Sequence, residues 1–135
     1  MKKILYYVTD HGKGHATRSI AIIQEILKHN IEVVVRNTNA IKFFKQSLPD
    51  VKTIVGKTDV RSSIKKDGFS IDKNETIKNQ INWIHDFEKN LLNEKQIVNK
   101  INPDLIVSDI SVIPFLVSKQ LSIPSIAVSN FSWFD

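Results

Sequence analysis

Residues 3–27, KILYYVTDHGKGHATRSIAIIQEIL, contain an apolar run, a glycine loop and a helical pattern in succession. The run from Lys3 to Thr9 is rich in β-branched and aromatic residues, which predicts a buried strand. Gly12 and Gly14 permit a tight turn in which the backbone approaches a ligand closely. After the loop, isoleucines and a final leucine recur at the i, i+3, i+7 spacing of an amphipathic helix. This order opens a βαβ unit, and we expect a ligand site at the helix N-terminus.

The loop departs from the common nucleotide-binding patterns. A dinucleotide-binding loop would place a third glycine where this chain has Thr17, and an acid where the second strand ends in Arg36. The phosphate-binding pattern GxxxxGK[ST] is absent as well. The loop instead carries His11 and His15, and Arg18 follows in the first helical turn. Titratable side chains at these positions favour proton transfer or polar recognition over a dinucleotide site.

Composition and length indicate one globular domain over residues 1–135, large enough for a sizeable core. No apolar stretch approaches the length of a membrane span, and Asp10 and His11 interrupt the first apolar run before it could serve as a signal peptide. Cysteine is absent, which excludes disulfides and thiolate chemistry and is compatible with the cytoplasm.

The net charge of +5 comes from 19 Lys and Arg against 14 Asp and Glu. The lysines are scattered and are not interleaved with aromatic residues, so the sequence does not predict a nucleic-acid platform. Two interpretations remain for this charge. It forms a solvated surface, or it attracts an anionic membrane face or a phosphate-bearing substrate.

Strands and helices alternate along the chain, which predicts an α/β fold: a Rossmann-like parallel sheet with helices on both faces. The further predicted strands are 31–35, 51–55, 104–109 and 125–129. A helix is predicted over 40–48, and residues 57–71 are expected to form a loop over one edge of the sheet.

Two further helices are predicted with more detail. Asp72 is expected to cap a single long helix whose apolar face continues to Ile101. Ser111 is expected to cap a later helix with Pro114 in its first turn. The buried face of that later helix is predicted to consist of Phe115, Leu116 and Leu121.

Ligands of open parallel sheets bind beyond the carboxyl ends of the strands. Polar residues follow each predicted strand at that edge. They are the 10–15 loop, Asn37 and Asn39, the 57–71 loop, residues 108–111 and residues 130–133. Because these clusters are far apart in sequence and converge on one edge, the sequence predicts a site there.

Three motifs resemble the N-terminal half of GT-B-fold glycosyltransferases. They are YYVTDHGKGHATRS at 6–19, PDLIVSD at 103–109 and VSNFSW at 128–133. The resemblance covers essentially the whole chain and is strongest to the front domain of arabinokinase-like proteins and to stand-alone predicted transferases. The GxGH loop also resembles that of lipid-linked N-acetylglucosaminyltransferases of cell-wall synthesis.

This resemblance implies that the chain is one GT-B half, the acceptor-binding half of a nucleotide-sugar-dependent glycosyltransferase. In such enzymes the second domain mostly holds the donor, so the chain would need that domain in cis or as a partner chain. The domain is expected to be either complete or shortened in its last strands. No cofactor is implied beyond the nucleotide sugar as co-substrate. The expected acceptor is a sugar acceptor, with lipid-linked or phosphate-bearing molecules as candidates, and the expected location is the cytoplasm or the membrane periphery.

The resemblance assigns catalytic roles to two residues. His15 corresponds to the histidine near the acceptor hydroxyl, where imidazole is suited to accept a proton. Asp109 corresponds to the acid that orients this histidine. The alternatives are structural: His15 caps the helix or bonds across the loop, and Asp109 caps the helix that follows it.

Substrate-binding roles are expected for His11, Gly12, Gly14, Arg18, Asn130 and Trp133. For His11 the alternative is a bond that fixes the loop, and for Arg18 it is a surface ion pair in place of a phosphate or carboxylate clamp. Trp133, with Phe131, either stacks on a sugar ring or fills the core. No His and acid cluster has metal-ligand spacing, so no metal site is predicted.

A second hypothesis, from a different class, is that the chain is a non-catalytic binding or regulatory module with the same fold. The presence of a glycine-rich donor domain beside this chain would favour the transferase.

Overall fold

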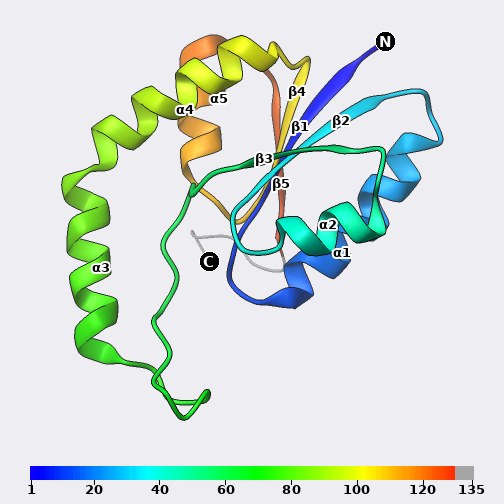
Figure 1. The fold of residues 1–135 in the computed structure, drawn as a ribbon. Helices are drawn as coiled ribbons and strands as arrows, with labels where there is room; N and C mark the ends of the chain where they lie inside the picture. Colours follow the sequence, from blue (N-terminus) through cyan, green and yellow to red (C-terminus); the bar gives the residue numbers. More distant parts are fainter. Residues whose placement is uncertain (130–135) are drawn as a thin grey trace.

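The computed structural model describes residues 1–129, and its centre is a sheet of five parallel strands (Figure 1). The strands are β1 Lys3–Val8, β2 Glu32–Asn37, β3 Lys52–Val55, β4 Leu105–Asp109 and β5 Ser125–Val128. Their order is β3-β2-β1-β4-β5, with β1 at the centre, and the sheet is parallel as predicted. The chain moves outward from β1 to β3 and then returns to the other side of β1. The direction of winding therefore reverses between β1 and β4.

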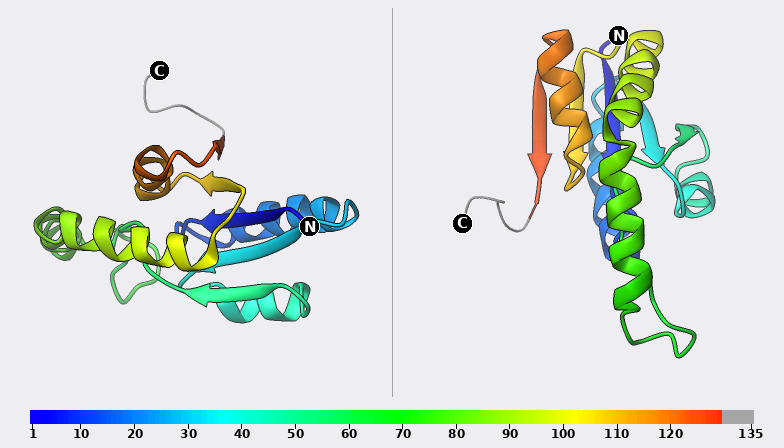
Figure 2. Two further views of the ribbon diagram at one scale, coloured as in Figure 1. Left: turned by 90° about the horizontal axis from the view of Figure 1, so that it is seen from above. Right: turned by 90° about the vertical axis from the view of Figure 1, so that its left-hand side faces the viewer.

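Helices cover both faces of this sheet, as predicted (Figure 2). They are α1 Lys13–Leu27, α2 Ile41–Ser47, α3 Lys73–His85, α4 Phe87–Ile101 and α5 Ile113–Leu121. Alternate side chains of β1 explain the two layers, because Tyr6 belongs to a core cluster with α1 and α2 residues and Tyr7 to one with α4 and α5 residues. In α1, Ile20 and Ile23 are buried as the period predicts, whereas Leu27 at the helix end is 38% exposed.

The prediction of one long helix after Asp72 is wrong. Asp72 does cap a helix, since its Oδ1 accepts a hydrogen bond from the Glu75 backbone N–H at 3.0 Å. That helix, α3, ends at His85, and α4 begins at Phe87. No residue of α3 is buried, because most of α3 projects beyond the end of the sheet; only Trp83 near its end packs against a core cluster (Figure 2). The apolar period predicted a helix correctly but could not show whether its face has a partner.

The prediction that residues 57–71 form a loop over one edge of the sheet holds only for the first residues of this segment, which lies between β3 and α3. Its first residues lie at the carboxyl edge, where Thr58 is buried. The rest runs beside α3, with one bridge between Ile64 and Ile71 (Figure 1). Hydrogen bonds of 3.0 Å from the Ser63 backbone N–H to Thr76 Oγ1 and from Asn79 Nδ2 to Ser63 Oγ join this segment to α3.

The start of α5 also differs from the prediction. Pro114 lies in the first turn as expected, but α5 has no side-chain cap, so Ser111 does not cap it. The fully buried apolar face consists of Ile113 and Val117. Phe115, Leu116 and Leu121, which were predicted to be buried, are only partly so, and the two leucines pack at the margin of the core.

A buried ion pair joins the sheet to α4. Arg36 at the end of β2 donates from Nε and Nη2 to the two carboxylate oxygens of Glu94, each at 2.7 Å. Both side chains are at most 5% exposed, and the Tyr7 hydroxyl donates to Glu94 at 2.8 Å. Arg36 Nη1 also donates to the Val55 carbonyl. The arginine that replaces the acid of a dinucleotide site is therefore part of the internal structure.

Candidate functional site

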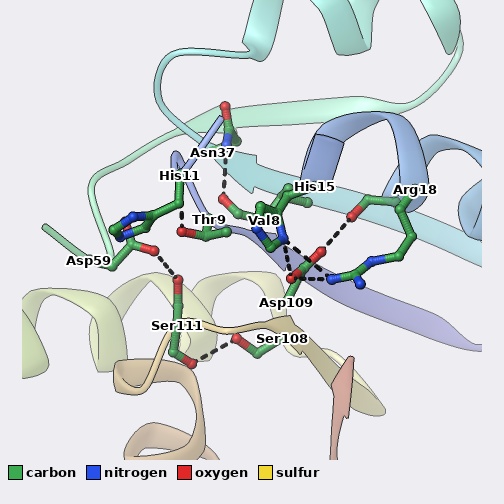
Figure 3. A network of polar contacts seen from close by, with 11 residues as sticks. Val8, Thr9, His11, His15, Arg18, Asn37, Asp59, Ser108, Asp109 and Ser111 are labelled. Carbon is green, nitrogen blue, oxygen red and sulfur yellow. Dashed lines mark hydrogen bonds and ion pairs between the residues drawn. The ribbon is translucent and has the colours of Figure 1, made fainter. Parts of the chain in front are cut away.

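Of the predicted site residues, His11, His15, Arg18 and Asp109 lie together where the winding of the sheet reverses, beyond the carboxyl ends of β1 and β4 (Figure 3). Open α/β sheets bind ligands at this reversal point because the loops there diverge and leave a crevice. The register pairs Val8, the last residue of β1, with Asp109, the last residue of β4. The glycine loop begins after Val8, and Gly12 in it has a φ of 92° and donates its N–H to the Asp10 carbonyl. This turn brings the first turn of α1 to the end of β4.

His15 and Asp109 are in direct contact. The distance from His15 Nδ1 to Asp109 Oδ1 is 2.9 Å, and the aspartate side chain has no exposed surface while that of the histidine is 23% exposed. A carboxylate can only accept a hydrogen bond, so Nδ1 carries the hydrogen and Nε2 is the acceptor nitrogen of the ring. The contact of Arg18 with Nδ1, at 3.3 Å, sets two donors beside each other and is not a hydrogen bond in this tautomer.

Two further α1 residues bind the same carboxylate. Arg18 Nη2 donates to Asp109 Oδ1 at 2.8 Å, and Ser19 Oγ donates to Oδ2 at 3.4 Å. The structure therefore places the Arg18 guanidinium on an internal acid, where the sequence left open a substrate clamp or a surface ion pair. Because Asp109 is directed to α1 and α5 has no side-chain cap, Asp109 does not have the alternative role of a helix cap.

A cavity of about 520 Å³ adjoins His15. One wall comes from the turn after β4 and the start of α5, and another comes from the α3–α4 junction. Its lining residues are His11, His15, Thr58, Asp59, Val60, Gln80, Trp83, Phe87, Ile110, Ser111, Val112 and Ile113. The mixture of aromatic, aliphatic and a few polar groups is typical of sites that bind small organic molecules.

The two aromatic residues of this cavity were not identified as site residues from the sequence. Trp83 and Phe87 are partly buried, and Lys57 Nζ lies 5.5 Å from the centre of the Trp83 ring. A signal was present, because Gln80, Trp83 and Phe87 repeat at i, i+3, i+7. A second stripe beside them consists of the exposed Ile77, Ile81 and Ile84. Only the position of α3 beyond the sheet shows which of the two stripes faces the site.

A chain of hydroxyl contacts fixes the cavity wall. Ser111 Oγ donates to Asp59 Oδ2 at 2.9 Å, Thr58 Oγ1 donates to Ser111 Oγ at 3.3 Å, and Ser108 Oγ donates to the Ser111 carbonyl at 2.8 Å. Ile110, between Asp109 and Ser111, has a φ of 74°, an uncommon conformation for a β-branched residue. The hydroxyl contacts hold this strained turn next to Asp109, as is common at functional sites.

The other predicted residues are distributed around the loop. His11 is exposed and lines the cavity, and its backbone N–H contacts Thr9 Oγ1 at 3.3 Å. Gly14 lies inside α1 with open space around it. Asn130 and Trp133, together with Phe131, lie outside the described residues, so their expected roles remain predictions.

Within residues 1–129, no group of three or more His, Asp and Glu residues could hold a metal ion. In the same part of the chain, no helix is both long and apolar enough to cross a membrane.

A family model described as glycosyl transferase family 1 matches residues 2–134. The chain belongs to this family. This result agrees with the resemblance of the glycine loop and of the two later motifs. A curated relative, the L-arabinokinase of Arabidopsis thaliana, is 25% identical over 131 residues, which are 95% of this chain and 12% of that protein.

Solved structures show the same fold for this family 1 domain. The calicheamicin glycosyltransferase CalG4 matches with a TM-score of 0.65 and 15% identity over 99% of this chain. MurG of Acinetobacter baumannii matches with a TM-score of 0.62 and 12% identity over 96% of this chain. The chain spans about a third of each of these structures, which is 35% in both cases. It has the Rossmann-like fold of GT-B glycosyltransferases.

Proposed function

We propose that this chain is the acceptor side of a nucleotide-sugar-dependent glycosyltransferase and that His15 is its general base. The observation that carries the proposal is the contact between His15 and the buried Asp109 at the edge of a cavity. Membership of glycosyl transferase family 1 supports the reaction class.

The geometry supports a defined proton transfer. Asp109 holds the hydrogen of His15 on Nδ1, so Nε2 has the lone pair that accepts a proton from an acceptor hydroxyl. The hydroxyl oxygen then forms a bond to the anomeric carbon of the donor, and the bond from that carbon to the diphosphate oxygen breaks with its electron pair. The imidazolium formed in this step is stabilised by the adjacent carboxylate.

The cavity supports the assignment of the acceptor to this side. Trp83 and Phe87 offer an apolar wall for the body of a molecule, while Asp59 and Gln80 offer polar contacts. The donor is assigned to a second domain or a partner chain. This assignment accords with the calicheamicin glycosyltransferase structure, of which this chain spans 35%.

The test combines the chain with a donor-binding domain, in one polypeptide or as two chains. The assay measures release of nucleoside diphosphate from UDP and GDP sugars with a panel of hydroxyl acceptors. His15→Ala should reduce kcat by about 10²–10⁴-fold with little change in donor affinity. Asp109→Asn should reduce kcat by a smaller or similar factor, because the imidazole remains but its tautomer and orientation are no longer fixed.

His29→Ala is the matched control, since His29 is exposed just beyond the other end of α1. It should leave kcat unchanged. Thermal melting of each variant separates loss of chemistry from loss of folding. Normal turnover by folded His15→Ala would refute the base, and His11 would be the next candidate. An assembled protein that transfers no sugar would favour the non-catalytic binding module.

A further inference from the structure

A second cavity, of about 550 Å³, is lined by Thr9, Asp10, Gly12 and Lys13 of the glycine loop and not by His15. The first residues of α1 and of α2 and the segment after β3 enclose it. It shares no lining residue with the cavity at His15. Three cationic side chains line it: Lys13 from α1, Lys42 from α2 and Arg61 from the segment after β3.

No salt bridge within residues 1–129 neutralises these three cations; several other lysines share this property, but these three cations line one cavity. Arg18 and Arg36 are bound to carboxylates, whereas Arg61 forms no salt bridge within residues 1–129. Over the same residues Lys13 and Lys42 form none either. By contrast, Lys2, Lys3, Lys28 and Lys78 each lie within 4 Å of an acid.

A single acid, Asp10, lines this cavity, and it is already engaged. Its Oδ1 accepts a hydrogen bond from the Asn39 backbone N–H at 2.9 Å. One carboxylate cannot neutralise three cations, so the cavity keeps a positive potential that a concave wall of low dielectric strengthens. The first turn of α1 has no acidic residue to offset this potential.

We propose that this second cavity is a subsite for a phosphate or diphosphate group. The three side chains approach from separate elements, so they can bind different oxygens of one anion through charge-assisted hydrogen bonds. The volume exceeds that of a phosphate group, and Phe43, which is 40% exposed, offers an apolar wall for the group that carries it. Assigning this anion to the sugar acceptor rests on the proposed function, whereas binding of phosphate by the cavity does not.

Calorimetric titration of the chain with pyrophosphate and with inorganic phosphate at low ionic strength tests the subsite. We expect saturable binding with one site, tighter for pyrophosphate and weakened by added salt. Lys42→Gln and Arg61→Gln should each weaken binding about tenfold, since each removes one charge-assisted contact. Lys45→Gln is the matched control: Lys45 lies on the same helix, is exposed and does not line the cavity, so binding should not change. Absence of saturable binding, or equal weakening by all three substitutions, would overturn the proposal.

Two further arms separate the source of the phosphate from the chemistry at His15. Vesicles containing phosphatidic acid should bind the chain in a manner sensitive to Lys42→Gln if the group belongs to a lipid headgroup; binding of pyrophosphate alone identifies a soluble phosphorylated molecule. His15→Ala should retain pyrophosphate binding, because His15 does not line this cavity. Failure of the anion subsite would therefore leave the general-base proposal standing, and failure of the base would leave the subsite standing.

Discussion

Asp109 has no exposed surface, and its carboxylate contacts three residues of one helix turn: His15, Arg18 and Ser19. A buried carboxylate is costly unless it is paired and hydrogen-bonded, and these contacts satisfy both oxygens. Arg18 binds the same oxygen as His15, so the carboxylate stays in place whether or not the histidine is oriented toward it. The catalytic pair that we propose is thus fixed by a residue that does not need to touch substrate.

The buried contacts of Tyr7 and Arg36 with Glu94 can be tested through the pH dependence of the free energy of unfolding. Burial raises the pKa of Tyr7 above its ordinary value of 10.0, and the adjacent Glu94 charge raises it further. Above about pH 10 the unfolded chain loses this proton while the folded chain keeps it, so stability falls as pH rises. Tyr7→Phe cannot ionise in either state and should lose this part of the decline, up to about 1.4 kcal/mol per pH unit.

Urea unfolding of the parent and Tyr7→Phe between about pH 8 and pH 11 measures this difference. Below about pH 10 the variant should be less stable by about 1 kcal/mol, because one hydrogen bond to Glu94 is lost. Tyr6, whose pKa burial also raises, remains in the variant and keeps its own contribution to the slope. Parallel stability curves above pH 10 would show that Tyr7 does not keep its proton in the folded state.

Among the structural elements, the strands were predictable because hydrophobic runs report on burial, and their alternation with helices predicted parallel pairing. The strand ends predicted that His15 and Asp109 lie at one edge of the sheet, and the family resemblance predicted their contact. The contact of Arg36 with Glu94 was not, because nothing in either residue's local pattern indicates its partner 58 positions away. Trp83 was missed because helical periodicity does not show which face of α3 meets the site.

Two glycines allow a matched test of the position of the Arg36 guanidinium, one beside it at the end of β3 and one in open space in α1. A Cβ added at Gly56, directly after β3, would overlap the Arg36 guanidinium, which is held by Glu94 and cannot move freely. Gly56→Ala should therefore reduce the free energy of unfolding by about 2 kcal/mol. A Cβ at Gly14 meets open space within α1, so Gly14→Ala should add about 0.5 kcal/mol through helix propensity. Chemical denaturation measures both, and equal effects would argue against the Arg36 position.

A comparison of α3 with α4 tests whether the apolar face of α3 is exposed while that of α4 is buried. Ile81 in α3 is 60% exposed, whereas Val98 in α4 has no exposed surface. Val98→Ala should cost about 2 kcal/mol through lost burial and the cavity that remains. Ile81→Ala should change stability by less than about 0.5 kcal/mol in the same denaturation experiment. A large loss at Ile81 would mean that the α3 face is covered in solution.

At the scale of the whole molecule, the His15–Asp109 pair and both cavities lie at the carboxyl edge of the sheet. The cavity at His15 and the basic cavity are both lined by residues of the loop between β1 and α1, and they share no lining residue. This arrangement gives one domain a place for the reacting hydroxyl and a separate place for an anionic group. Under the proposed function, the nucleoside of the donor binds outside this domain.

Calorimetric titration of the chain with UDP and GDP sugars, with pyrophosphate as the reference, tests this division of roles most directly. The account predicts that no nucleotide sugar binds more tightly than pyrophosphate, because only the diphosphate finds contacts on this chain. A micromolar Kd for one nucleotide sugar, at least about tenfold tighter than that of pyrophosphate, would contradict it by showing a nucleoside pocket on this domain.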